Sequence, residues 1–246
     1  MASQKHNHTS WVEIDLKAVR HNFQALKKMT HRQIVELRSC DGLPARGIRV
    51  PKILGVVKAE SYGHGMLPVT KELIKLGVDF LGVSELAEGI ALRQKKIKKP
   101  ILVFETPLPS MVKDYVDHGL ISTVCSDKVA KALNAYARKT GQKAEVHIKV
   151  DTGMGRLGVW YPEAVDFIRR VMQFPSLRVT GLYTHFPLAD TDAKFTQRQI
   201  DAMAKLVRTL DDEGHDFKKI LQIVTDIFAA YCLEFGKVYK IMFRKS

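Results

Sequence analysis

Cysteine is scarce in this chain of 246 residues. Its three cysteines, Cys40, Cys125 and Cys232, are odd in number and lie far apart in the sequence. They therefore match neither the close ligand spacing of a metal site nor the paired framework of a disulfide-stabilised secreted domain. This cysteine usage favours a reducing, cytoplasmic compartment.

Long apolar runs are missing as well. No stretch reaches the roughly 18 consecutive apolar residues that a membrane-spanning helix needs. Residues 1–10 are polar, and we expect a disordered terminus there and not a secretory signal. The sequence therefore predicts no contact with a membrane.

Acidic residues are fewer than basic ones: the sequence has 26 Asp and Glu, 39 Lys and Arg, and a net charge of +13. Such an excess attracts anionic partners, including nucleic acid, without specificity. The basic residues are nevertheless dispersed, and the densest run, Arg93–Lys99, has the pattern of a helix end and a loop. Neither aromatic interleaving nor zinc-ligand spacing accompanies it. We expect no specific nucleic-acid partner and no metal.

Apolar residues make up 46% of the sequence, which is enough for a substantial core. Short apolar runs alternate with amphipathic segments along most of the chain. We interpret as buried strands the runs Ile53–Val57, Phe80–Val83, Ile101–Phe104, Ile121–Val124, Val146–Val150 and Val179–Tyr183. The helical segments that follow them are Leu67–Leu76, Glu85–Arg93, Pro109–His118, Asp127–Thr140, Pro162–Gln173 and Thr196–Glu213.

This alternation predicts an α/β fold in which right-handed crossovers build a parallel sheet covered on both faces. Six units, with room for a seventh and an eighth strand after residue 218, suit a (β/α)₈ barrel of the TIM type. Ahead of them, the alternating segment Trp11–Leu16 predicts a half-buried strand, and a helix is expected over Leu16–Lys28. Residues 30–51 have weak periodicity and several turn residues, and we interpret them as an insertion or long loop.

Lys58 directly follows the apolar run Ile53–Val57 and precedes a loop that contains Gly63 and Gly65. An unpaired ammonium at the end of a buried strand is expensive, and desolvation favours the neutral amine that Schiff-base chemistry with a carbonyl compound requires. The ordinary alternative is a lysine that extends its side chain to water. For an isolated lysine this alternative is favoured.

Two further strand ends carry reactive side chains. The segment Lys149–Gly158 contains Arg156, and the segment Gly181–Phe186 contains His185. Because the carboxyl ends of barrel strands face one mouth, we expect an amine, a guanidinium and an imidazole to meet there.

Together these segments resemble the alanine racemases, pyridoxal-phosphate enzymes of fold type III with a barrel domain and a second, C-terminal β domain. Val56–Gly65 is similar to the family's cofactor-lysine signature, and Lys149–Gly158 to its substrate-arginine motif. Thr184–Phe186 is similar to its histidine strand, and Trp11–Asn22 to its opening strand and helix. The resemblance covers about residues 11–215, interrupted at about 30–51. Two ten-residue motifs in the family's order make a specific signal.

The resemblance implies a role for each matched residue. Lys58 would form the Schiff base with pyridoxal phosphate and act as one of two bases at the substrate Cα. Tyr62 would hydrogen-bond the cofactor phosphate, and His185 would lie beside the pyridine ring. Arg156 would hold the substrate carboxylate and the cofactor's phenolic oxygen, for which a bidentate guanidinium is suited. Lys149, which is carbamylated in some relatives, would orient the arginine.

Neighbouring residues have simpler explanations. We expect Asp151 and Thr152 to shape a turn and Met154 to belong to the core. His64 suits either a ligand contact or a packed position on the barrel rim. Gly63, Gly65, Gly153 and Gly155 are expected to serve backbone geometry.

After about residue 216 the family pattern decays. Phe228 and Ala229 stand where relatives carry an Asn-Ser pair, and an ungapped alignment puts Arg244 at the arginine that contacts the pyridine nitrogen. The sequence contains no counterpart of the C-terminal domain, nor of the tyrosine that serves as the opposite-face base in the partner subunit. We therefore interpret residues 11–220 as the barrel, incomplete at strands 7–8, and residues 221–246 as its divergent or truncated end.

The expected function is that of a cytoplasmic alanine racemase with impaired activity, which converts L-alanine to D-alanine for peptidoglycan synthesis. The resemblance implies a homodimer, and it leaves the choice between alanine and serine open. An alternative is a non-catalytic, single-domain barrel that binds pyridoxal phosphate, and a third is an inert fragment. The motif Lys149–Gly158 favours racemase ancestry.

Overall fold

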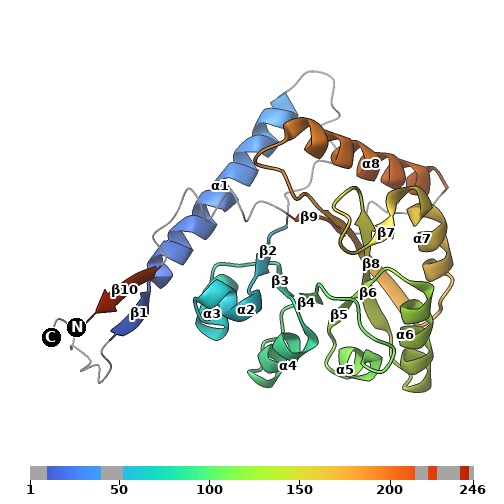
Figure 1. Cartoon of the computed structure of the whole chain (residues 1–246), viewed down its shortest axis with the longest axis horizontal. Helices are drawn as coiled ribbons and strands as arrows, with labels where there is room; N and C mark the ends of the chain where they lie inside the picture. Colours follow the sequence, from blue (N-terminus) through green and yellow to red (C-terminus); the bar gives the residue numbers. More distant parts are fainter. Residues whose placement is uncertain (1–9, 40–51, 214–220, 226–238, 244–246) are drawn as a thin grey trace. The chain divides into compact units, whose positions relative to one another are not determined.

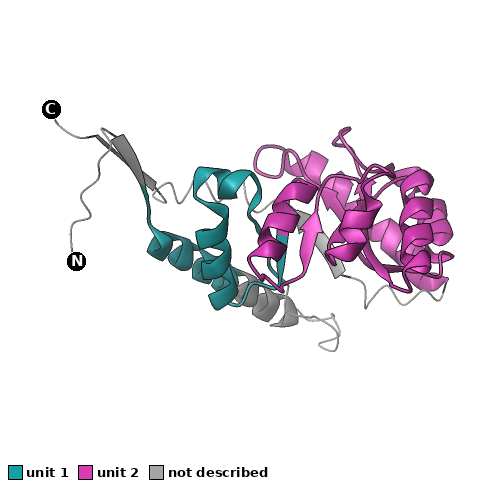
Figure 2. Ribbon diagram, turned by 90° about the horizontal axis from the view of Figure 1, so that it is seen from below, with its two compact units in different colours: residues 1–81, 234–246 teal, residues 82–233 magenta. Residues whose placement is uncertain are grey.

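The computed structural model describes residues 10–39, 52–213, 221–225 and 239–243 (Figure 1). The chain divides into two compact units, which Figure 2 distinguishes by colour. Unit 1 comprises residues 1–81 and 234–246, and unit 2 comprises residues 82–233. No helix in the described part of the chain is long and apolar enough to cross a bilayer.

Unit 1 joins the two ends of the sequence through a small antiparallel sheet. Its elements are β1 (Ser10–Ile14), α1 (Leu16–Ser39), β2 (Leu54–Val56), α2 (Lys58–Gly63), α3 (Met66–Lys75), the start of β3 (Phe80–Val83), and β10 (Tyr239–Phe243). Strand β1 pairs with β10, with Ser10 opposite Phe243. Helices α1 and α3 are connected by an ion pair of 2.6 Å between Arg20 and the buried carboxylate of Glu72.

Helix α1 is longer than the sequence analysis predicts. The interpretation of residues 30–51 as a loop is wrong for residues 30–39, because α1 continues to Ser39. The segment Thr30–Ser39 contains neither glycine nor proline, and Arg32, Gln33 and Leu37 are favourable helix formers. Nothing in it ends a helix before Gly42. Residues 40–51 lie outside the described residues.

Unit 2 contains most of the parallel sheet and its helices. The strands are β4 (Ile101–Val103), β5 (Ile121–Val124), β6 (Ala144–Asp151), β7 (Val159–Trp160), β8 (Leu177–His185) and β9 (Leu221–Thr225). The helices are α4 (Leu86–Gln94), α5 (Val112–Asp117), α6 (Asp127–Lys139), the short 3-10 helix η1 (Tyr161–Glu163), α7 (Ala164–Met172) and α8 (Ala193–Asp212). Neighbouring strands follow the order β4–β5–β6–β8–β9, with β7 added beside β6.

The core of unit 2 explains why these segments form a covered parallel sheet. Every residue of β4 and of β5 is buried, as expected for strands packed on both faces. Helix α7 turns Phe167, Ile168 and Val171 inward, while Arg169 and Arg170 lie on its exposed side. The six strands predicted from apolar runs are all present, and their pairings are parallel where β4, β5, β6 and β8 meet.

The barrel-type α/β prediction is confirmed by the alternating elements and the parallel pairings of the described residues. Strand β9 supplies the seventh parallel strand, since Gly181–His185 of β8 pair with Leu221–Thr225. Strand β10 is the next strand among the described residues, and it pairs with β1 instead of extending the parallel sheet. Within the described residues the parallel sheet therefore has no eighth barrel strand.

Candidate functional site

Lys58 opens a turn with an unusual backbone. It directly follows β2 and Val57, and the four residues after it, Ala59 to Tyr62, have φ values of 49°, 54°, 52° and 56°. This left-handed conformation costs an L-residue with a Cβ about 1–2 kcal/mol. Four such residues in succession require that the surroundings hold them, and strained backbone of this kind gathers at functional sites.

Hydrogen bonds from both sides hold the turn. The Ser61 N–H donates to the Val57 carbonyl at 3.0 Å, and the Gly65 N–H donates to the Glu60 carbonyl at 2.7 Å. The Glu60 carboxylate accepts from the Met66 N–H at 2.9 Å and so caps helix α3. The turn that begins with Lys58 is therefore fixed to a helix start.

His64 belongs to this fixed turn. Its Nδ1 lies 2.7 Å from the Ser61 carbonyl oxygen, and because that oxygen can only accept, Nδ1 carries the proton. The contact fixes the orientation of the ring and is compatible with both roles that the sequence leaves open for His64.

Lys58 and Tyr62 lie close to each other on the turn. The Lys58 ammonium nitrogen is 5.8 Å from the centroid of the Tyr62 ring, Lys58 is half-buried, and Tyr62 is 43% exposed. No carboxylate of the described residues forms an ion pair with Lys58. An amine without a counter-ion next to a phenol is a donor set that suits a cofactor with an aldehyde and a phosphate.

Lys149 is buried near the carboxyl end of β6 in unit 2. It is 5% exposed, and its ammonium nitrogen lies 5.4 Å from the ring centroid of Tyr183. Lys149 and Tyr183 are opposite each other in the register of β6 and β8. The ring of Tyr183 thus makes a cation–π contact with a buried ammonium.

Tyr183, which the sequence does not single out, contacts Lys149 and is fully buried. Thr123 donates its hydroxyl proton to the Val103 carbonyl at 2.6 Å, so the Tyr183 hydroxyl, 2.8 Å away, is the donor to Thr123. Burial raises the pKa of Tyr183 above its usual range, and the phenol stays neutral. Its position was predictable: alternate residues of a strand share a face, and Tyr183 lies two residues before His185.

Arg156 is exposed on the loop that follows β6. Asp151 closes the first half of this loop, because its two carboxylate oxygens accept from the N–H groups of Gly153 at 2.9 Å and Gly155 at 2.8 Å. These contacts support the interpretation of Asp151 as a turn-forming residue. The charge of Arg156 acts against the burial that raises the pKa of Tyr183, so the guanidinium is within electrostatic reach of that phenol.

His185 ends strand β8, beside β6 and on the strand that carries Tyr183. The preceding Thr184 lies 2.7 Å from Thr152, hydroxyl to hydroxyl, at the start of the Arg156 loop. Unit 2 therefore gathers Lys149, Arg156 and His185 on two neighbouring strands and one loop.

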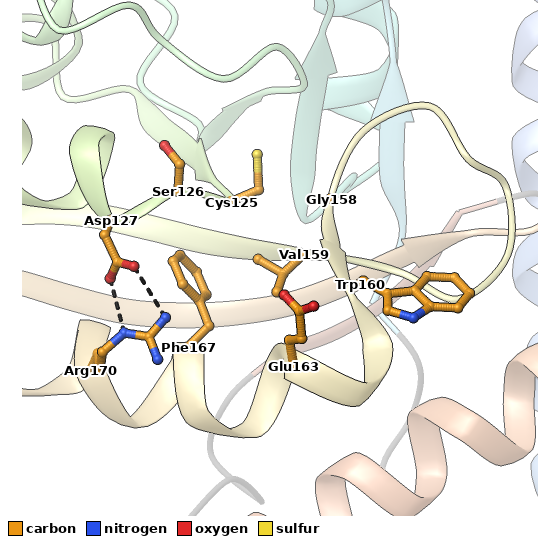
Figure 3. Close-up of a pocket in the computed structure, with 9 residues that line it drawn as sticks. All are labelled: Cys125, Ser126, Asp127, Gly158, Val159, Trp160, Glu163, Phe167 and Arg170. Carbon is orange, nitrogen blue, oxygen red and sulfur yellow. Dashed lines mark hydrogen bonds and ion pairs between the residues drawn. The ribbon is translucent and has the colours of Figure 1, made fainter.

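A cavity of about 310 Å³ borders the Arg156 loop (Figure 3). It is lined by Cys125, Ser126, Asp127, Gly158, Val159, Trp160, Glu163, Phe167 and Arg170. Asp127 and Arg170 form a two-bond ion pair at one end of it, with both distances 3.1 Å. None of the predicted site residues lines this cavity, although Gly158 ends their loop.

Cys125, which lines the cavity, is influenced electrostatically by the buried Lys149. Burial raises the pKa of the Cys125 thiol, and the positive charge of Lys149 acts in the opposite direction. Lys149 is thus close enough to Cys125 to influence it electrostatically.

The predicted site residues fall into two described groups. Lys58 and Tyr62 share one turn of unit 1, and Lys149, Arg156 and His185 share the strand ends of unit 2. Arg244 lies outside the described residues. The meeting of the two groups in one site stays a prediction.

Comparison with known proteins gives one consistent result. Residues 45–223 match the family model described as the N-terminal domain of alanine racemase. The alanine racemase of Halothermothrix orenii is 36% identical over 203 residues, which are 82% of this chain and 49% of that protein. The alanine racemase of Geobacter sp. strain M21 is 40% identical over 213 residues, or 83% of this chain and 51% of that protein.

A solved alanine racemase from Clostridium difficile 630 has the same fold. It superposes with a TM-score of 0.78 at 32% identity and covers 92% of this chain and 55% of its own. The chain spans about half the length of the curated relatives it matches.

Proposed function

The chain belongs to the alanine racemase family, and from this membership we propose that it takes part in the interconversion of L-alanine and D-alanine. The observation that carries the proposal is the Lys58 turn: an amine without an ion-pair partner in the described chain, on a strained backbone tied to a helix start. D-Alanine made in the cytoplasm would supply peptidoglycan synthesis.

The family's cofactor, pyridoxal phosphate, suits the residues of this turn. When bound, it supplies an electron-accepting ring that makes the substrate's Cα proton acidic. Lys58 would provide the amine for the cofactor's aldehyde, and Tyr62 would provide a hydroxyl for its phosphate. The Val57 and Glu60 contacts fix the backbone from which both side chains extend.

The residues of unit 2 suit the substrate. Arg156 offers a planar, two-pronged donor to the alanine carboxylate. Lys149, buried against the Tyr183 ring, would hold Arg156 in place, and His185 would pack beside the cofactor ring. Arg244 would contact the pyridine nitrogen.

Racemisation requires proton exchange on both faces of the Cα atom. Lys58 serves one face. The described residues offer no assigned base for the other face, which in a homodimer would come from a partner subunit. Because loss of a positioned acid or base costs about 10²–10⁴-fold in rate, we expect this chain alone to racemise alanine slowly.

The first test is cofactor capture. Pyridoxal phosphate is added to the purified chain, the visible absorption of the bound cofactor is recorded, and reductive trapping followed by peptide mapping locates the attachment. Lys58→Ala should abolish both signals. Lys52→Ala, an exposed lysine six residues earlier, is the matched control and should change neither.

The outcome separates the candidate functions. Bound absorption that survives in Lys58→Ala would overturn the assignment of the cofactor lysine. Cofactor capture at Lys58 without any conversion between alanine enantiomers would favour the non-catalytic barrel.

A further inference from the structure

Gln199 of helix α8 contacts both segments that carry the unit 2 site residues. Its side chain is 1% exposed, and its amide nitrogen donates to the Thr152 hydroxyl at 3.1 Å and to the His185 carbonyl at 3.2 Å. Thr152 in turn hydrogen-bonds Thr184 at 2.7 Å. One buried amide thus connects the start of the Arg156 loop to the end of β8.

We propose that Gln199 is a positioning residue: it holds the Arg156 loop against the end of β8 and thereby sets the affinity of the site for the substrate carboxylate. This inference rests on the proposed function, in which Arg156 binds that carboxylate. Gln199 itself touches neither substrate nor cofactor in this account.

The Arg156 loop needs such a support because of its composition. It contains Gly153, Gly155 and Gly158 within six residues, and glycine loses more backbone freedom on ordering than any other residue. Asp151 restrains the N–H groups of the first two glycines only. Helix α8 supplies the second restraint through Gln199 and through Phe195, whose ring lies 3.1 Å from the place of a Cβ atom on Gly153.

Packing alone does not explain why residue 199 carries an amide and not an apolar side chain. Its oxygen is buried and has no hydrogen-bond partner among the described residues, although a buried amide normally satisfies both ends. A methionine would fill nearly the same volume without burying an unsatisfied oxygen. The two donated hydrogen bonds, both to the site-bearing segments, are what the amide contributes and methionine lacks.

The start of α8 reinforces this geometry. Asp192 caps the helix by accepting from the Phe195 N–H at 2.9 Å, and the Thr196 hydroxyl donates to the Leu188 carbonyl at 3.3 Å. The helix is therefore attached to the loop that leaves His185, and Gln199 extends this attachment to the Arg156 loop.

The test compares Gln199→Met with Gln197→Met. Gln197 is exposed on the same helix and hydrogen-bonds only Asp201, at 2.8 Å, among the described residues, so it controls for helix and residue type. Arg156 is the sole trypsin site between Lys149 and Arg169, so cleavage after it reports opening of the loop. Each variant is also loaded with pyridoxal phosphate and titrated with L-alanine, with the cofactor's absorption as the readout.

We expect Gln199→Met to be cut after Arg156 about tenfold faster than the parent chain, since it loses the hydrogen bond to Thr152 of the loop and the one to His185 of β8. The alanine concentration at half-saturation should rise by a similar factor, with the full absorption change and the cofactor affinity unaltered. Gln197→Met should match the parent chain in both measurements.

Equal cleavage after Arg156 in the two variants would overturn the proposal. Faster cleavage at all sites of Gln199→Met would also overturn it, because that pattern indicates a general packing role. If alanine leaves the absorption of the parent chain unchanged, the proposed function fails, and with it the effect of Gln199 on substrate affinity. The cleavage comparison still decides whether Gln199 restrains the loop.

Discussion

Replacement of Gly158 with alanine should detach the end of the Arg156 loop from strand β6. Gly158 has a φ of +135°, and a Cβ atom there would lie 2.6 Å from the backbone nitrogen of Asp151 and 2.9 Å from the carbonyl carbon of Val150. A φ in this range strains a residue with a Cβ by about 1–3 kcal/mol. Forcing a methyl group into packed atoms costs about 1–3 kcal/mol more, and backbone atoms of a central strand cannot move aside.

The contacts that attach the end of the Arg156 loop to β6, and so oppose this strain, contribute little free energy. Strand β7 pairs with β6 only at Val150 with Val159 and at Asp151 with Trp160. These contacts and the burial of Val159 contribute about 2–4 kcal/mol. The two strain terms sum to about 2–6 kcal/mol, which matches or exceeds this contribution, so the loop should open locally while the rest of unit 2 stays folded.

Gly155→Ala is the matched control in the same loop. Gly155 has a φ of +72°, but a Cβ atom there would meet nothing within 4 Å. Its cost should be limited to the left-handed strain of about 1–2 kcal/mol. Trypsin cleavage after Arg156 should be more than tenfold faster in Gly158→Ala than in Gly155→Ala, and urea unfolding should show a loss of about 2–4 kcal/mol in the former. Equal cleavage rates and equal stabilities would refute the steric argument.

Two further predictions concern pH and the Lys58 turn. Burial lowers the pKa of His147 from 6.5 to about 4, so the unfolded chain binds more protons than the folded chain between these values. Stability should be fully present above pH 6.5 and fall by about 3 kcal/mol as the pH drops to about 4, as measured by urea unfolding; an equally steep fall in His147→Leu would contradict this cause. Glu60→Ala removes the cap of α3 and should destabilise the turn by about 1 kcal/mol, which weakens binding of pyridoxal phosphate in an absorbance titration. Unchanged binding would show that the cap does not support Lys58.

The strands and most helices were predictable because their signals are local. Apolar runs of four to five residues between turn residues mark β3, β5 and β8, and helix α6 is capped by Ser126, whose hydroxyl accepts from the Val129 N–H. The extension of α1 to Ser39 was not predictable from apolar periodicity, which is weak there, although the segment contains no helix-breaking residue.

The site was only partly predictable, because several of its features depend on contacts distant in sequence. The left-handed turn from Ala59 to Tyr62 contains no glycine, so no local sequence preference predicts it. The hydrogen bond from the Met66 N–H to the Glu60 carboxylate helps to hold it. Gln199 lies 47 residues from Thr152 and has no motif of its own. Lys58, Lys149, Arg156 and His185, in contrast, are singled out by short motifs at strand ends, and their meeting in one site stays a prediction.

Exchange of the alanine Cα proton with solvent tests the central claim most directly, because it needs only the base on the Lys58 side. The chain is loaded with pyridoxal phosphate in D₂O. L-Alanine and D-alanine are supplied in separate reactions, and deuterium incorporation at Cα is followed by NMR in each. We predict faster incorporation into one enantiomer than the other, its loss in Lys58→Ala and its retention in Lys52→Ala. Incorporation that persists in Lys58→Ala, or that is absent from the loaded parent chain, would contradict the account.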